Sequence, residues 1–160
     1  MRALLLHNPS AGTGAHSAES LSKAVSKAGY SVTYCPTKEG LYKDALKQDT
    51  DLLVIAGGDG TIAKIIRRMR DTDIPLAILP LSTANNITRS VGVDGDADAL
   101  LRLLYSHDTV HLDIGLAAGP WGRRRFVEGL GLGALAHLMV EGSKPPAAER
   151  TRIGRERLRA

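Results

Sequence analysis

The segment Gly57-Gly58-Asp59-Gly60-Thr61 directly follows an aliphatic run and has the residue types that hold a polyphosphate. Glycines let backbone N–H groups approach phosphate oxygens, and a helix that begins after them directs its positive end at the same group. Because a carboxylate repels phosphate, Asp59 would instead hold a magnesium ion on the phosphates or orient an attacking hydroxyl. The pattern therefore predicts a site for phosphoryl transfer. The plainer alternative is a glycine-rich turn in which Asp59 is the N-cap of the next helix.

Other common motifs for nucleotides, metals and nucleophiles are missing from the sequence. There is no Gly-x-x-x-x-Gly-Lys-Ser/Thr loop, and no third glycine follows Gly12 and Gly14 in dinucleotide-fold spacing. The five histidines have no ligand spacing, and the single cysteine, Cys35, has no partner for a disulfide or metal cluster. We therefore predict no metal site among them and no Ser-His-Asp or Cys-His arrangement.

The elements that must position the glycine-rich loop alternate between apolar strands and amphipathic helices. Repeated strand, loop and helix units imply parallel strands joined by right-handed crossovers, with ligand loops at the carboxyl ends of the strands. The sequence thus predicts an α/β fold with a doubly wound, mostly parallel sheet and helices on both faces. The expected strands are residues 2–7, 30–35, 51–56 and 76–79, and the expected helices are residues 16–28, 40–47, a helix beginning near Thr61, one opened by residues 81–86, and 96–106.

The pattern changes after residue 108. Two strands are expected at residues 109–116 and 123–128, separated by a Gly119-Pro120-Trp121-Gly122 turn, which together would form an antiparallel hairpin. A short helix is expected at residues 134–140. We therefore predict an α/β domain at residues 1–108, the hairpin and helix of a β-rich second domain at 109–144, and a basic tail at 145–160.

Composition and charge exclude several classes of protein. With 160 residues, of which 43% are hydrophobic, the chain can bury one core, and its apolar runs are too short for a membrane span or a signal peptide, which predicts a cytoplasmic protein. Residues 150–160 contain five arginines and one glutamate, so they account for the whole net charge of +4. A neutral body does not favour a nucleic-acid partner. The tail and the arginines at 123–125 are interpreted as solvated, with contact to acidic lipid headgroups as the alternative.

Four motifs, each following an expected strand, resemble in order the motifs of the diacylglycerol kinase catalytic domain family. They are residues 8–14, which read Asn-Pro-Ser-Ala-Gly-Thr-Gly, Thr37, the glycine-rich loop, and residues 79–86 with Arg89. Asp113 and the segment 126–133 also match the family, so the resemblance covers roughly residues 3–140.

The resemblance implies that the chain binds ATP and Mg2+ as the nucleotide-binding part of a kinase that phosphorylates a lipid hydroxyl such as that of diacylglycerol. It places Asp59 at the metal as the catalytic residue. The residues that it assigns to the nucleotide cleft are Asn8, Thr37, Gly57, Gly58, Asp59, Gly60, Thr61, Thr83, Asn85 and Asn86. For Asn8, Thr37 and Thr83, ordinary turn or N-cap duty is an equal alternative.

The sequence departs from the family pattern at three places. Ser82 stands where the family usually has glycine, which would restrict the loop or crowd a phosphate. Lys64 reverses a charge beside the phosphate loop, where it would either assist ATP binding or face solvent. Finally, only the opening of the family's second domain is recognisable, without its late acidic motif.

Two alternatives to a lipid kinase stay open. A NAD kinase-type phosphotransferase shares the glycine-rich loop, although its pattern differs from this chain at residues 80–86. A nucleotide-binding module without catalysis would fit the missing acidic motif. Exposed strand edges would favour pairing with another chain as a homodimer, and a lipid substrate would bring peripheral contact with a membrane.

Overall fold

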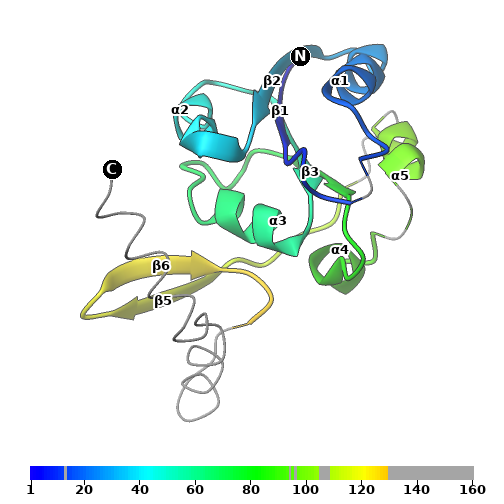
Figure 1. Ribbon diagram of the computed structural model, residues 1–160. Coiled ribbons are helices and arrows are strands. Elements are labelled where there is room, and N and C mark those ends of the chain that lie inside the picture. Colours follow the sequence, from blue (N-terminus) through cyan, green and yellow to red (C-terminus); the bar gives the residue numbers. More distant parts are fainter. Residues whose placement is uncertain (13, 94, 96, 105–108, 130–160) are drawn as a thin grey trace, which may run out of the picture. The chain divides into compact units, whose positions relative to one another are not determined.

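Four parallel strands form the central sheet in the order β2-β1-β3-β4 (Figure 1). They are β1 (Arg2–His7), β2 (Ser31–Pro36), β3 (Leu52–Gly57) and β4 (Leu76–Pro80). The structure, a computed structural model, describes residues 1–12, 14–93, 95, 97–104 and 109–129. The predicted α/β class with a mostly parallel sheet is confirmed, and the four strands match the predicted ones to within a residue or two.

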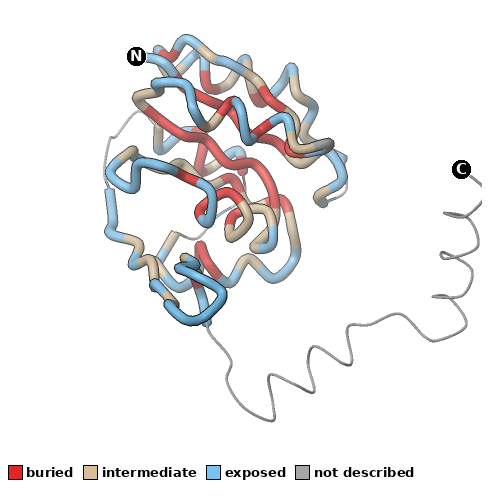
Figure 2. The backbone as a smooth tube through the Cα atoms, turned by 90° about the vertical axis from the view of Figure 1, so that its left-hand side faces the viewer, coloured by how far each residue is buried: buried red, intermediate tan, exposed pale blue. Residues whose placement is uncertain are grey.

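The two central strands are apolar on both faces, which is why helices cover the sheet from both sides. Leu5 and Val54 point to the face covered by α1 (Ala18–Lys27) and α5 (Ala97–Leu103). Leu6 and Ile55 point to the face covered by α2 (Tyr42–Ala45), α3 (Asp59–Ile66) and α4 (Asn86–Ser90). In Figure 2 the buried segments gather along these strands and on the inner sides of the helices.

Several of the predicted helices differ in extent from those observed, and the helix expected at 96–106 is seen at Ala97–Leu103. The helix expected at 40–47 is shorter, because a 3₁₀ turn (Lys38–Gly40) precedes α2 and Gly40 adopts a φ of 78°, which breaks a regular helix. The helix expected to begin near Thr61 begins at Asp59 instead, with Gly58 as its N-cap. Among the described residues, no helix has the length and apolar character needed to cross a membrane.

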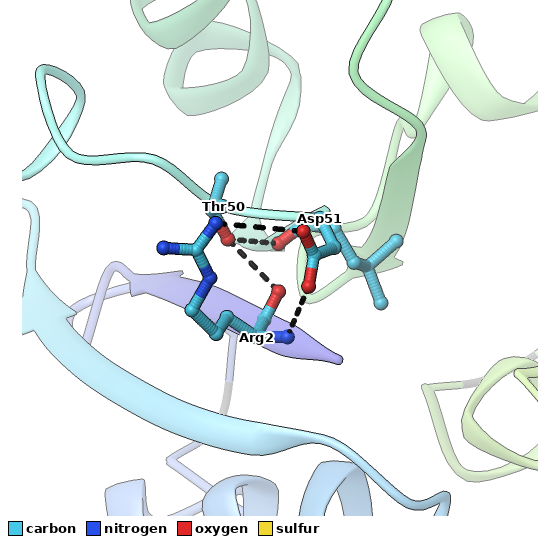
Figure 3. Close-up of polar contacts among 4 residues, drawn as sticks. Arg2, Thr50 and Asp51 are labelled. Atoms are coloured by element: carbon cyan, nitrogen blue, oxygen red, sulfur yellow. Dashed lines mark hydrogen bonds and ion pairs between the residues drawn. The ribbon is translucent and has the colours of Figure 1, made fainter.

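Contacts between Arg2 and residues 50–51 fix the register of β1 against β3 at the amino edge of the sheet (Figure 3). The backbone N–H of Arg2 donates to a carboxylate oxygen of Asp51 at 2.6 Å, and the Asp51 N–H donates to the Arg2 carbonyl at 2.9 Å. The hydroxyl of Thr50 donates to the same carbonyl at 3.0 Å. The N–H of Arg2 lowers the pKa of Asp51, and the charges of Arg2 and the amino terminus act in the same direction.

A separate antiparallel hairpin consists of β5 (Gly115–Gly119) and β6 (Gly122–Phe126). The predicted hairpin is confirmed, but the strand expected at 109–116 is wrong, since regular structure begins only at Gly115. The turn lies at the predicted residues: Gly119 pairs with Gly122, which has a φ of 88°. The base of the hairpin is anchored because Val127 is buried in the cluster around α3 and the Arg125 guanidinium donates to the Met69 carbonyl.

Contacts divide the chain into two compact units, Met1–Glu128 and Gly129–Ala160. The first unit contains the hairpin together with the α/β part, whereas the sequence predicted a division after residue 108. That domain division stays a prediction. The helix expected at residues 134–140 and the basic tail lie outside the described residues.

Candidate active site

The predicted site lies at the carboxyl edge of the sheet, where the chain leaves β1 toward one face and β3 toward the other. Such a reversal opens a crevice between the two strands in doubly wound sheets. At this point the backbone N–H of Asn8 donates to the Ala56 carbonyl at 2.8 Å, and the Asn8 side-chain amide lies 3.3 Å from the Thr61 hydroxyl. The first and third of the four predicted motifs are therefore joined by a direct hydrogen bond between Asn8 and Thr61, and Asn8 is also bonded to the end of β3.

Both glycines that open the loop are required by close packing. A Cβ on Gly57 would lie 2.8 Å from the Cβ of Thr61, and a Cβ on Gly58 would lie 2.8 Å from the Cβ and Oγ of Ser82. Gly58 has a φ of −95° and a ψ of 177°, a conformation open to any residue. Its identity is therefore set by the approach of Ser82 and not by the backbone angles.

The start of α3 at Asp59 determines which backbone groups face the crevice. The N–H groups of Thr61 and Ile62 donate to the Gly58 carbonyl at 2.8 and 3.1 Å. The N–H groups of Asp59 and Gly60, the first two residues of the helix, have no acceptor within the helix. With the dipole of α3 behind them, these donors suit an anion.

The carboxylate of Asp59 caps a helix, but not its own. One of its oxygens accepts the N–H of Asn86 at 3.0 Å and the other accepts the N–H of Ile87 at 3.2 Å. These donors belong to the first turn of α4, 27 and 28 residues further along the chain. The alternative that Asp59 is the N-cap of the following helix is wrong, since Gly58 occupies that position, and Asp59 instead joins α3 to α4.

The loop before α4 is held by reciprocal bonds between two of its own residues. The Ser82 hydroxyl donates to the Asn85 side-chain oxygen at 2.8 Å, and the Asn85 amide donates to the Ser82 carbonyl at 2.7 Å. Asn85 adopts a left-handed φ of 48° and does not cap α4 with its side chain. Thr83 and Asn86 are exposed. Ser82 was expected to restrict the loop or crowd a phosphate; it lies close to Gly58, and the crowding of a phosphate stays a prediction.

The first motif also lies against the fourth. Gly12 has a φ of 69°, and a Cβ there would overlap the carbonyl oxygen of Leu81. Only glycine combines this conformation with this approach. The first, third and fourth motifs thus form one continuous group of loops.

The second motif lies further along the same edge. Thr37 follows β2 and is buried, and its N–H donates to the His7 carbonyl at 2.8 Å. The ammonium of Lys64 lies 3.4 Å from the Thr37 carbonyl and 4.8 Å from the centre of the buried Tyr42 ring. Lys64 was expected either to assist ATP or to face solvent, but it binds the β2 side of the site by a hydrogen bond and a cation–π contact.

His7 is a buried polar residue of this edge that the sequence did not single out. Its Nδ1 lies 3.2 Å from the Tyr34 hydroxyl, and it directly precedes Asn8. Burial lowers the pKa of His7, and the nearby His16 lowers it further, which favours the neutral imidazole. Burial raises the pKa of Tyr34. The available signal was a histidine that ends an otherwise apolar strand immediately before a predicted ligand loop.

The described residues contain no preformed metal site, and the cavity that they enclose lies away from the glycine-rich loop. Among the described residues, no three His, Cys, Asp or Glu side chains cluster as a metal site would require. A single carboxylate such as Asp59 still suits Mg2+, which in nucleotide sites takes most other ligands from phosphates and water. A cavity of about 170 Å³ lies elsewhere, at the amino edge between Leu4, Asp49 and Met69. It is smaller than the roughly 300–1,000 Å³ of typical ligand sites.

Comparison with known proteins gives a consistent result. A family model described as diacylglycerol kinase catalytic domain matches residues 2–117. A diacylglycerol kinase of Bacillus subtilis (strain 168) is 29% identical over 96% of this chain and 52% of its own length. The lipid kinase YegS of Escherichia coli (strain K12) is 33% identical over 54% of this chain and 33% of its own length.

Solved structures agree with the sequence relatives. The crystal structure of a diacylglycerol kinase from Bacillus anthracis str. Sterne superimposes with a TM-score of 0.56 at 26% identity. The match covers 71% of this chain and 44% of that chain. The present chain therefore spans about half the length of these two diacylglycerol kinases.

Proposed function

Because the chain belongs to the diacylglycerol kinase catalytic domain family, we propose that it is the ATP-binding part of a lipid kinase. In the proposed reaction the γ-phosphoryl group of ATP is transferred to a lipid hydroxyl such as that of diacylglycerol. The observation that carries the proposal is the meeting of three of the four motif loops where β1 and β3 lead to opposite faces of the sheet.

The glycine-rich loop would hold the phosphates of ATP through its backbone. Gly57 and Gly58 have no side chain between β3 and the crevice, and the first turn of α3 presents N–H donors without helical acceptors. The positive end of α3 would stabilise the negative charge of the phosphates. Thr83 and Asn86 are exposed polar side chains beside the loop and would contact the nucleotide, whereas Asn85 maintains the shape of its own loop.

Asp59 would hold Mg2+ or orient the acceptor hydroxyl. When bound, the metal would neutralise charge on the transferring phosphoryl group. Each Asp59 oxygen accepts one N–H bond from α4 and keeps a further lone pair for a metal or a hydroxyl proton. The position of α4 would therefore respond to metal binding, because both functions use the same carboxylate.

A nucleotide-binding module without catalysis is the second candidate. It is favoured by the engagement of both Asp59 oxygens in capping α4. We also propose that the lipid acceptor is of the diacylglycerol type and that the protein binds at the membrane surface. Pairing of two copies through open strand edges is a further proposal.

The test is to incubate the purified chain with labelled ATP, Mg2+ and either diacylglycerol in mixed micelles or NAD. Label in the lipid is expected, with Asp59→Asn abolishing transfer and Asp98→Asn, an exposed carboxylate of α5, leaving it unchanged. Gly58→Val should abolish ATP binding. Binding of ATP without transfer to either acceptor would favour the non-catalytic module, and label in NAD alone would favour a NAD kinase.

A further inference from the structure

The turn between β5 and β6 combines glycine and proline, which are common in turns, with an exposed tryptophan and exposed arginines. All residues from 118 to 124 are exposed, and they comprise alanine, two glycines, proline, Trp121 and two arginines. Exposed turns commonly carry Asn, Asp or Ser, whose side chains bond the local backbone. Here no Asp, Glu, Asn, Gln, Ser or Thr is present between residues 115 and 126.

The tip of the hairpin is apolar because of Trp121, whose exposed fraction is 59%. A Cβ on Gly119 would lie 2.6 Å from the indole ring, so the ring rests against the backbone of the opposite strand end. Leu116, further along β5, is also half exposed. An indole fixed at a protruding turn matches the preference of tryptophan for the interface between lipid and water.

The charges around this tip are all positive. Arg123 pairs with Ala118 and Arg124 with Ala117, so the two guanidinium groups lie on opposite faces of the hairpin. Both arginines are exposed, whereas Arg125 donates to the Met69 carbonyl and anchors the base. If the turn of the hairpin contacts a flat surface, one arginine therefore lies on each side of the indole.

We propose that this turn is a membrane-docking element, in which Trp121 enters the interface of an anionic bilayer and Arg123 and Arg124 bind lipid phosphates. The inference rests on the proposed lipid kinase function, because a lipid acceptor must be reached at a bilayer. The positive charges of Arg123 and Arg124 complement the negative charge of anionic lipid, and the exposed indole suits the bilayer interface. Anionic lipid is therefore the proposed partner of this surface. A nucleic acid is disfavoured, because two arginines provide few phosphate contacts and residues 1–149 carry no net charge.

The experiment uses the fluorescence of Trp121, which is the single tryptophan of the chain. The full chain is titrated, without ATP, with vesicles of phosphatidylglycerol or of phosphatidylcholine, and with the same lipids brominated in their acyl chains. We expect a blue shift and quenching by brominated lipid with phosphatidylglycerol only. Trp121→Ala should reduce co-sedimentation with the same vesicles.

A charge-matched pair of variants separates the hairpin from general electrostatic attraction. Arg123→Gln with Arg124→Gln should weaken binding to phosphatidylglycerol about 30-fold, since each basic residue near the surface contributes about fivefold. The control, Lys23→Gln with Lys27→Gln on the exposed side of α1, should leave binding unchanged. A second control removes residues 150–160, which carry the basic tail.

Three results with vesicles would overturn the proposal: no spectral change with any vesicle, equal loss of binding in the arginine and lysine pairs, or loss of all binding on removal of the tail. Quenching by a single-stranded oligonucleotide but not by vesicles would identify a different partner and overturn it too. Because no step needs ATP, vesicle binding without phosphoryl transfer would leave this proposal intact and remove the lipid kinase activity. Phosphoryl transfer to lipid without vesicle binding would support the lipid kinase activity and overturn the docking proposal.

Discussion

Replacing Gly58 by alanine should destabilise the protein through a clash with Ser82. The new Cβ would lie 2.8 Å from the Cβ and Oγ of Ser82, well inside the roughly 3.5–4.0 Å of an ordinary carbon contact. The backbone of Gly58 is extended, so alanine carries no conformational penalty there. Ser82 cannot simply rotate away, since Asn85 holds its hydroxyl and its carbonyl at 2.8 and 2.7 Å.

The magnitude follows from the cost of overpacking a rigid contact, about 1–3 kcal/mol. For a chain of 160 residues this corresponds to a decrease in Tm of about 2–12 °C. The clash should disappear in a Ser82→Gly background, which removes both atoms that Gly58→Ala would meet. The two substitutions should therefore couple by about 1–3 kcal/mol in a double-mutant cycle.

The assay is urea unfolding of the four proteins of the cycle, followed by circular dichroism. Gly60→Ala is the matched control, because no atom lies within 4 Å of the Cβ it would add, and alanine favours helix α3 by up to about 1 kcal/mol. If Gly58→Ala costs the same free energy of unfolding with and without Ser82, the close approach of the two loops is wrong.

Three further predictions concern capping and titration. Asp59→Ala should cost about 1–2 kcal/mol and speed hydrogen exchange at the first-turn amides of α4, and unchanged exchange there would contradict the cap. His7 has a lowered pKa, so its stabilising contribution is complete above the ordinary histidine pKa of about 6.5 and is lost as the pH falls through its folded pKa. The Tm of His7→Gln should accordingly depend less on pH across this window than the Tm of the wild type. The exposed control His111→Gln should behave like the wild type. Equal slopes of Tm against pH in all three proteins would refute the lowered pKa of His7. Asp51 also has a lowered pKa, so its contribution to stability is present above the ordinary aspartate pKa and is lost as the pH falls through its folded pKa. The stability of Asp51→Asn should therefore fall slightly less on acidification than that of the wild type. An identical fall in both proteins would argue against the Arg2 contact.

Local patterns in the sequence predicted the sheet and the edge on which the loops lie. The aliphatic run of β3 is apolar on both faces, which indicates a parallel strand covered by helices, and the glycines that follow it indicate a close backbone approach. The order of four motifs after four strands identified the family before any geometry was known. These features depend on neighbouring residues, so a linear sequence is sufficient to predict them.

The bonds inside the site depend on tertiary structure, because they join residues that the crossovers bring together. Asp59 caps α4 only because β4 pairs with β3, which returns the chain to the start of α3 after 27 residues. The same return sets Ser82 against Gly58, and the pairing of β1 with β2 sets Tyr34 beside His7. The sequence alone supports the prediction of a phosphate site at the glycine-rich loop. The engagement of Asp59 with a second helix was decided by sheet order, since no local pattern specifies a partner that far along the chain.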